Sequence, residues 1–387
     1  MSFRAMNDTL AGRKNIQGGI QMKRMIIPLL SLVVLAIGST PVFSAVYTVT
    51  DLGTLGGGSS TAVGINNEGQ VVGQADTMNT SHQSYLGHAF FYKGGNMKDL
   101  GTLGEQSSVA TGINNSGQVV GYVGNQSQSR AFVYSGGKMT EIGTPDAPYS
   151  LANGINKKGQ VVGWSGFTAN SDGHAFLYDG TNTKDLGTLG GWFSEAYGIN
   201  DKGQVAGYSF NACSALHAFL YDGAAMKDLG TLGGWYSKAT GINDSGQVVG
   251  NSNIAGDTAG HAFLYEGNTM KDLGTLGGSD SYASAINSSG KVVGYSSTAG
   301  DAAQHAFLYE GGTMLDLNNL VGGSGWVLEK AFGINDSGQI VGIGINGNGQ
   351  EHAFLLDDPP HCPLPSALTL FGPGLAGLWF FRRKTVA

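Results

Sequence analysis

The chain has 387 residues and a formal net charge of -7, and 65 of its residues are glycine. Because only 13% of the residues are charged and 41% are hydrophobic, the composition excludes a disordered polyelectrolyte. The acidic balance also excludes nucleic acid as a partner, since nucleic-acid binding needs a basic surface. Short apolar runs alternate with Asn, Asp and Gly clusters, a pattern typical of β-strands joined by tight turns. We therefore expect an all-β fold.

Residues 1–45 are predicted to form an N-terminal export signal. The run from Met22 to Gly38 has a basic start and an apolar middle, and the small residues up to Ala45 suit signal peptidase. The signal is complete from Met22 onward, so the sequence leaves open whether translation starts at Met22 or at Met1.

Residues 46–358 contain seven copies of one repeat. The tripeptide Gly-Ile-Asn, or Ala-Ile-Asn in the sixth copy, recurs every 42 to 48 residues and is followed by a glycine suited to a tight turn. A third segment beginning with His-Ala-Phe or Arg-Ala-Phe, and a fourth resembling Met-Lys-Asp-Leu-Gly, complete a predicted four-stranded meander. The isoleucines of the tripeptides are Ile65, Ile113, Ile155, Ile199, Ile242, Ile286 and Ile334.

This repeat length with four strands is typical of β-propeller blades. An alanine three residues before each isoleucine suggests that the first strand lies innermost, near a crowded axis. The segment Val46–Leu55 has the pattern of a fourth strand, and the last copy stops at Asp358 without one. A ring that is closed by joining these ends leaves no open sheet edge. We therefore predict a seven-bladed β-propeller of four-stranded blades, closed by the N-terminal strand completing the last blade.

Residues 359–366 are predicted to be a linker with a sorting motif, and residues 367–387 a hydrophobic segment with a basic C-terminal tail. The apolar run is followed by Arg382, Arg383 and Lys384, which fits membrane attachment with the C-terminus in the cytoplasm. A buried C-terminal helix is the alternative.

The tail resembles the PEP-CTERM sorting signals, in particular the variant with the motif Val-Pro-Leu-Pro-Ala. The matching residues are Pro363, Leu364 and Pro365, whereas Cys362 replaces the valine and Ser366 separates the proline from the alanine. This resemblance implies cleavage by an exosortase in a Gram-negative bacterium. It also implies a product that ends at the cell surface or in the exopolysaccharide matrix.

The repeats are similar to the HAF-repeat family of bacterial extracellular proteins, which is named after the His-Ala-Phe tripeptide. This resemblance implies an extracellular location and no particular activity.

One histidine recurs at the same position of six repeats, and Arg130 replaces it in the second. Because arginine donates hydrogen bonds but is no neutral metal ligand, we predict a structural donor that binds the acid repeated in the fourth segment. We expect no metal site and no cofactor. The histidines are His88, His174, His217, His261, His305 and His352. The acids are Asp51, Asp99, Glu141, Asp185, Asp228, Asp272 and Asp316.

Catalytic motifs are weak in this sequence. There is no Gly-X-Ser-X-Gly elbow, zinc-protease motif or P-loop. An acid pair for glycoside cleavage would come from residues that we place in non-repeated loops, namely Glu105, Asp146, Asp172, Glu195, Asp280 and Glu329. A polysaccharide-cleaving hydrolase or lyase, and a purely structural envelope component, are therefore alternatives to a non-enzymatic binding protein.

The connections that vary between repeats share one edge of the predicted propeller, and functional residues concentrate on such loops. Aromatic residues in the connection before each tripeptide suit stacking against sugar rings, with Trp192 and Trp235 as a platform for polysaccharide. The alternative is that these rings wedge between blades. The candidate ligand-binding residues are Tyr149, Trp192, Phe193, Trp235, Tyr236, Tyr282 and Trp326.

Overall fold

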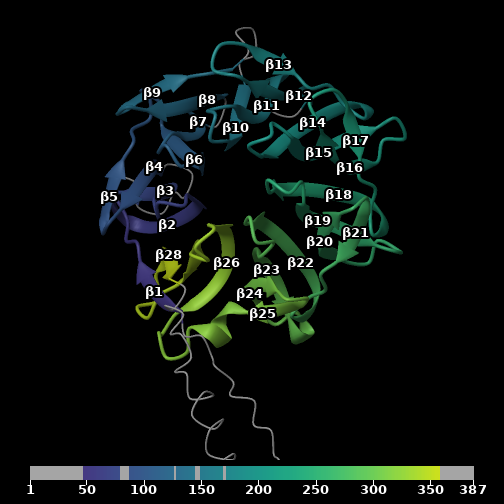
Figure 1. Cartoon of the computed structure of the whole chain (residues 1–387). Helices are drawn as coiled ribbons and strands as arrows, with labels where there is room; N and C mark the ends of the chain where they lie inside the picture. Colours follow the sequence, from purple (N-terminus) through teal and green to yellow (C-terminus); the bar gives the residue numbers. More distant parts are fainter. Residues whose placement is uncertain (1–46, 79–86, 126–127, 144–148, 169–170, 358–387) are drawn as a thin grey trace, which may run out of the picture. The chain divides into compact units, whose positions relative to one another are not determined.

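The computed structural model describes residues 47–78, 87–125, 128–143, 149–168 and 171–357, and its regular secondary structure is almost entirely β-strand (Figure 1). The expected all-β fold is confirmed. Among these residues, no helix is long and apolar enough to cross a membrane. The predicted export signal, sorting motif and hydrophobic tail lie outside the described residues.

Each of the first six repeats forms four strands, and each strand pairs antiparallel with the next one along the chain. Single parallel bridges additionally join Tyr149 to Ser129 and Leu216 to Tyr236. The strands are β2 (Gly56–Ile65), β3 (Val71–Thr77), β4 (His88–Lys93), β5 (Asn96–Asp99), β6 (Ser107–Ile113), β7 (Val119–Asn125), β8 (Gln128–Ser135), β9 (Lys138–Glu141), β10 (Tyr149–Ile155), β11 (Val161–Thr168), β12 (Ser171–Tyr178), β13 (Thr183–Asp185), β14 (Gly190–Ile199), β15 (Val205–Asn211), β16 (Leu216–Tyr221), β17 (Met226–Asp228), β18 (Gly233–Ile242), β19 (Val248–Ile254), β20 (Gly260–Glu266), β21 (Thr269–Asp272), β22 (Gly277–Ile286), β23 (Val292–Thr298), β24 (Gln304–Glu310) and β25 (Thr313–Asp316).

The sheet of the last repeat combines both ends of the described chain. Its strand order is β1 (Thr48–Asp51), β28 (Glu351–Asp357), β27 (Ile340–Ile345) and β26 (Val327–Ile334). The antiparallel register of the outer pair runs from Thr48 opposite Asp357 to Asp51 opposite Phe354. The first strand thus occupies the position that a fourth strand holds in the other repeats.

The hydrophobic core lies between consecutive repeats. Val72 and Ala89 of the first repeat pack against Ala110, Val119 and Phe132 of the second. Because both faces of each sheet are covered in this way, the His-Ala-Phe strands are apolar on both faces. The repeated alanines before the tripeptide are buried in these clusters, where the sheets of neighbouring repeats meet.

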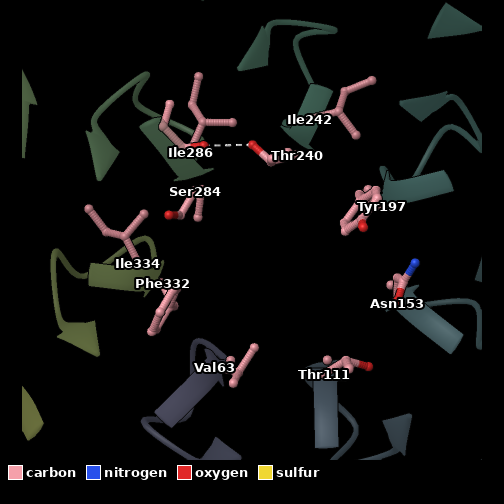
Figure 2. Close-up of a pocket in the computed structure, with 18 of the residues that line it drawn as sticks. Val63, Thr111, Asn153, Tyr197, Thr240, Ile242, Ser284, Ile286, Phe332 and Ile334 are labelled. Atoms are coloured by element: carbon pink, nitrogen blue, oxygen red, sulfur yellow. Dashed lines mark hydrogen bonds between the residues drawn. The ribbon is translucent and has the colours of Figure 1, made fainter. Parts of the chain in front are cut away.

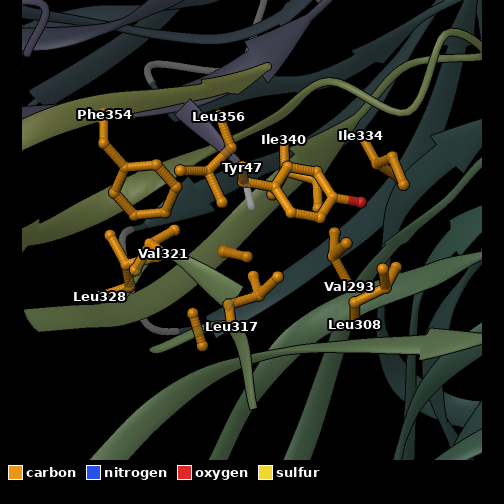
Figure 3. Close-up of a cluster of buried hydrophobic side chains, with 12 residues drawn as sticks. Tyr47, Val293, Leu308, Leu317, Val321, Leu328, Ile334, Ile340, Phe354 and Leu356 are labelled. Atoms are coloured by element: carbon orange, nitrogen blue, oxygen red, sulfur yellow. The ribbon is translucent and has the colours of Figure 1, made fainter. Parts of the chain in front are cut away.

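Tyr47 anchors the start of the described chain in a further cluster between the sixth and the last repeats (Figure 3). Its ring lies among Leu308 of β24, Leu317 of the 3-10 helix η2 (Leu317–Leu320) and Ile340 of β27. Its backbone amide donates to the carbonyl oxygen of Leu320 over 2.9 Å. A second 3-10 helix, η1 (Ala299–Asp301), follows β23.

Serines of the first strands connect neighbouring repeats through hydrogen bonds. Ser108 Oγ accepts from the amide of Ala89 over 2.8 Å and donates to the carbonyl of Gly101 over 2.7 Å. The same contact joins the last repeat to the first, because Ser60 Oγ accepts from the amide of Ala353 over 2.9 Å.

The repeated histidine binds the repeated acid in every case, as predicted. His88 Nδ1 lies 2.8 Å from Asp99 Oδ2, and Arg130 makes the equivalent bond to Glu141 over 2.9 Å. In the other repeats the histidine Nδ1 atom lies 2.7 to 3.1 Å from a carboxylate oxygen of the acid, and this contact joins the third and fourth strands in the same way. In the last repeat His352 is bound to Asp51 of β1.

Candidate functional site in the central cavity

The first strands of all seven repeats surround a cavity of about 660 Å³, here called the central cavity (Figure 2). These strands are β2, β6, β10, β14, β18, β22 and β26, so the first strand is innermost, as expected. One layer of the wall consists of the seven tripeptide isoleucines. The next layer is more varied and contains Val63, Thr111, Asn153, Tyr197, Thr240, Ser284 and Phe332.

The asparagines of the tripeptides follow the isoleucine layer and line an adjoining pocket of about 200 Å³, and this end of the first strands is here called the Asn end. The Nδ2 group of each asparagine donates to the backbone carbonyl of the asparagine in the next repeat, over 2.9 to 3.1 Å. All seven are buried, and the Oδ1 atom accepts from backbone amides of the following turn. The residues are Asn66, Asn114, Asn156, Asn200, Asn243, Asn287 and Asn335, and Asn335 donates back to Asn66.

The opposite end of the first strands is here called the mouth, and its side chains differ between repeats. They belong to the residues directly before the repeated alanine and to their cross-strand partners. The former are Thr61, Val109, Leu151, Glu195, Lys238, Tyr282 and Lys330. The latter are Gln74, Tyr122, Trp164, Tyr208, Asn251, Tyr295 and Ile343.

Glu195 forms a buried hydrogen-bonding group at the mouth. Its Oε2 atom accepts from the Tyr208 hydroxyl over 2.8 Å, and its Oε1 atom accepts from Asn153 Nδ2 over 3.0 Å. Our placement of Glu195 in a non-repeated loop is wrong, because it lies within β14. Burial and the nearby Glu195 charge raise the pKa of both Tyr197 and Tyr208, so these phenols stay protonated and act as donors.

Lys238 places a positive charge beside this group. Its Nζ atom lies 3.9 Å from the ring centroid of Tyr197 and 5.0 Å from that of Tyr208, within the range of cation–π contacts. Burial lowers the pKa of Lys238, and the charge of Glu195 partly offsets that effect. In the described part of the chain the Lys238 ammonium has no hydrogen bond and no ion pair. It is also the one charged group among the described residues that line the central cavity.

A second pocket of about 350 Å³, here called the rim pocket, lies beside the mouth between the fifth and sixth repeats. It shares Tyr236, Asn251 and Tyr282 with the wall of the central cavity. Its other polar lining residues are Asn253, Asp257, Thr258 and Asp280.

Internal hydrogen bonds hold both carboxylates of the rim pocket in place. Asp280 Oδ1 accepts from the Gly260 amide over 2.7 Å, and Asp257 Oδ1 accepts from the Trp235 amide over 2.9 Å. These bonds join the loop between β19 and β20 to the starts of β18 and β22. The variable connections and the starts of the first strands therefore share one edge here, as expected.

The seven aromatic residues that we predicted as ligand-binding fall into three groups. Tyr236 and Tyr282 line both the rim pocket and the central cavity. Trp235 is 67% exposed, and Trp192 is 47% exposed although its ring stacks on Phe210 with centroids 4.6 Å apart. The other three are half-buried, in line with the packing alternative, and they are Tyr149, Phe193 and Trp326.

Two of these half-buried rings have clear packing partners. Phe193 lies 5.8 Å from Tyr208 and 6.1 Å from Trp164, and Trp326 packs edge-on against Phe354. Trp326 packs against the core cluster that contains Phe354, and Phe193 packs against the neighbouring aromatic rings.

The carboxylates considered for glycoside cleavage lie in different repeats. Glu105 pairs with Arg130 over 2.6 Å, Glu195 binds Tyr208, and Asp280 belongs to the rim pocket. Our loop placement is also wrong for Asp172 in β12, for Asp280 in β22 and for Glu329, which is half-buried in β26. Asp146 and the Asp172 side chain lie outside the described structure. Among the described residues, no group of three His, Cys, Asp or Glu side chains is placed to hold a metal ion.

Sequence reasoning missed the mouth residues other than Glu195 and Tyr282, above all Lys238. A signal was present, because the residue before the repeated alanine changes in nearly every copy while its neighbours are kept. Variation at one position inside a repeated strand indicates a side chain that is free of the packing shared by all repeats.

Comparisons with known proteins identify the fold. A family model described as "Protein of unknown function (DUF3466)" matches residues 233–356. No curated protein matches the sequence. Solved structures that resemble the chain include the β-propeller domain of the Trilobed protease from Pyrococcus furiosus, with a TM-score of 0.52 at 11% identity, covering 81% of this chain and 96% of that one.

Two further solved structures have a similar fold. YCF48 bound to D1 peptide has a TM-score of 0.51 at 12% identity, covering 82% of this chain and 97% of that one. A puromycin-hydrolysing peptidase of Mycobacterium tuberculosis has a TM-score of 0.50 at 13% identity, covering 76% of this chain but only 53% of the peptidase. At such low identity these likenesses show the fold alone, which is that of a β-propeller.

Proposed function

We propose that the chain is a closed seven-bladed β-propeller that acts as a non-enzymatic binding module for polysaccharide. The closed architecture is supported by three contacts between the two ends of the described chain: β1 pairs with β28, Ser60 binds Ala353, and Asn335 binds Asn66.

One observation carries the binding function. The same strands that keep identical residues at the Asn end carry different polar and aromatic residues at the mouth. Packing alone would favour the same residue in each repeat, so the variation at the mouth points to a ligand without sevenfold symmetry.

The chemistry of the rim pocket favours a sugar ligand. Tyr236 and Tyr282 offer flat aromatic faces for stacking against pyranose rings. The side chains of Asn251 and Asn253 and the carboxylate of Asp280 offer donors and acceptors for hydroxyl groups. The exposed Trp235 lies beside the rim pocket, because its backbone amide donates to Asp257, which lines this pocket.

Retention on immobilised exopolysaccharide from the producing bacterium tests this proposal. The double variant Trp192→Ala/Trp235→Ala is expected to bind about thirtyfold more weakly, since two aromatic contacts of about 1 kcal/mol each are lost. Trp326→Ala is the control, because its ring packs on Phe354 and its loss should lower the melting temperature without changing retention. Unchanged retention of the double variant with a lowered melting temperature would assign Trp192 and Trp235 to packing.

A reducing-end release assay on the same polymer addresses the enzymatic alternative. We expect no release, and release by the purified chain would contradict the non-enzymatic assignment. A variant such as Glu195→Gln would then show whether that carboxylate takes part.

We also propose that the chain is exported to the surface or the extracellular matrix of a Gram-negative bacterium. The resemblance of residues 1–45 to an export signal and of Pro363, Leu364 and Pro365 to an exosortase motif supports this location. The intact mass of surface-extracted protein should lack both ends. If residues 382–387 are still attached, the tail is not removed and the hydrophobic segment would serve as an anchor.

A further inference from the structure

The Lys238 ammonium is the starting point, because it is a half-buried cation that points into a cavity without an anionic partner in contact. Its nearest partners are the faces of Tyr197 and Tyr208. The carboxylate of Glu195 is nearby but is bound by Tyr208 and Asn153 instead. A cation with cation–π contacts only can still accept an anionic partner, which would form charge-assisted hydrogen bonds.

The surroundings of Lys238 are rich in donors. Burial raises the pKa of Tyr236, Tyr282 and Tyr295, so these hydroxyls remain protonated and can donate. The amide of Asn251, opposite Lys238 on the neighbouring strand, adds a further donor. Such a set of an ammonium, phenols and an amide suits a carboxylate.

The position of this set relative to the rim pocket narrows the ligand class. Tyr236, Asn251 and Tyr282 belong to both cavities, so a sugar at the rim pocket lies next to the wall that carries Lys238. The rim pocket itself contains the acidic Asp257 and Asp280, which suit hydroxyl groups and disfavour a second carboxylate there. The acidic group of a bound sugar would therefore point towards the central cavity.

We propose that Lys238 binds the carboxylate of a uronic acid residue, so that the polysaccharide recognised by this chain is an acidic one. This inference rests on the polysaccharide binding proposed above. It adds the class of sugar and the residue that selects it.

The test compares one polymer in two chemical forms. Immobilised exopolysaccharide is used as extracted, and after carbodiimide activation and borohydride reduction, which convert uronic acids into neutral sugars. We expect the full chain to bind the native polymer at least tenfold more tightly than the reduced one. Lys238→Met keeps most of the side-chain volume without the charge, and it should bind both forms as weakly as the full chain binds the reduced form.

Lys271→Met is the matched control. Lys271 lies in β21 of the same repeat, and its ammonium lies 5.5 Å from the Tyr309 ring centroid, but it lines neither the central cavity nor the rim pocket. This variant loses the same charge and should bind the native polymer within twofold of the unaltered chain.

Each other outcome has a definite meaning. Equal binding of the native and reduced polymers by the unaltered chain, or unchanged binding by Lys238→Met, would overturn the role of Lys238. A loss of binding in Lys271→Met as large as that in Lys238→Met would show a general effect of charge and not a specific contact of Lys238. If the unaltered chain binds neither polymer, the proposed polysaccharide function itself fails.

Discussion

The two ends of the first strands differ in how they use the same backbone. At the Asn end all seven repeats place an asparagine that binds its neighbour. At the mouth, five residues earlier in the sequence, the same strands carry Glu195, Lys238 and Tyr282 at one repeated position. The difference teaches that one repeated position can keep a side chain that joins neighbouring repeats, while another position of the same strand takes a different side chain in nearly every repeat.

This division of labour predicts that variants fall into two classes. Changes at repeated positions should lower stability and leave the ligand preference intact. Changes at the mouth should alter the ligand preference and leave stability intact.

The largest effect is expected from removing a repeated element, namely residues 46–55. This deletion takes away β1 and the buried Tyr47 and Leu52, and it exposes the edge of β28. We expect a loss of several kcal/mol or failure to fold, because burial of each large side chain contributes about 1.5–3 kcal/mol. Deleting residues 378–387 is the control of equal length. Equal melting temperatures for the two truncations would disprove the closed architecture.

Asn243→Ala should show the next largest effect. The Asn243 side chain donates to Asn287 O and Gln247 Oε1, and it accepts from the Ser245 and Gln247 amides. Its loss leaves buried partners unsatisfied and should lower the free energy of unfolding by about 2 kcal/mol. Chemical denaturation measures this value, and retention on the polymer should not change. Loss of binding by a folded Asn243→Ala variant would contradict the expectation that the Asn end contributes to stability and not to ligand binding.

Asp51→Asn tests the contact that joins β1 to the last repeat. Burial alone would raise the pKa of Asp51, but hydrogen bonds from the Gly53 amide, His352 and Asn346 outweigh it and hold the pKa below its ordinary value. The stabilisation is therefore present above the ordinary aspartate pKa and is lost as the pH falls through the lower folded value.

At neutral pH we expect Asp51→Asn to cost about 1 kcal/mol, and the variant and the unaltered chain should converge in acid. Asp185→Asn is the matched control, because Asp185 binds His174 within a contiguous repeat and is more exposed. Melting curves across the pH range measure both. A pH-independent difference for Asp51→Asn would contradict the assigned role of the carboxylate.

The smallest effect is expected from Trp235→Ala. Its indole is 67% exposed, so the change in unfolding free energy should stay within about 0.5 kcal/mol. Trp192→Ala should cost about 1 kcal/mol because its ring stacks on Phe210. A larger loss of unfolding free energy for Trp235→Ala than for Trp192→Ala would show that the exposed fraction of these side chains does not indicate how much they contribute to packing.

The repeated part of the fold was predictable because each signal occurs seven times. The pairing of His88 with Asp99, and the exception Arg130 with Glu141, followed from two positions that recur together. The pairing of β1 with β28 followed from a strand pattern present at one end and missing at the other.

The candidate site was less predictable, because it depends on differences between copies. Glu195 was expected in a loop, since it did not match the repeat, yet strand position is set by the backbone and not by one side chain. The alanines were found from the sequence because they recur in all seven repeats, and the structure places them in the contact between sheets. Which varying residues meet at the mouth depends on the packing of separate repeats, and no local pattern encodes that distance.

The hydrogen bonds between asparagines at the Asn end form a closed series that has a direction but no terminus. Each asparagine donates to the next, and the seventh donates to the first. A helix, by contrast, leaves unpaired donors at one terminus and unpaired acceptors at the other. Each repeat carries its donor and its acceptor on the same asparagine, so duplicating a whole repeat would add one of each and leave no unpaired group in the series. The asparagines therefore set no limit of their own on the number of repeats, while each added repeat can carry a new residue at the mouth.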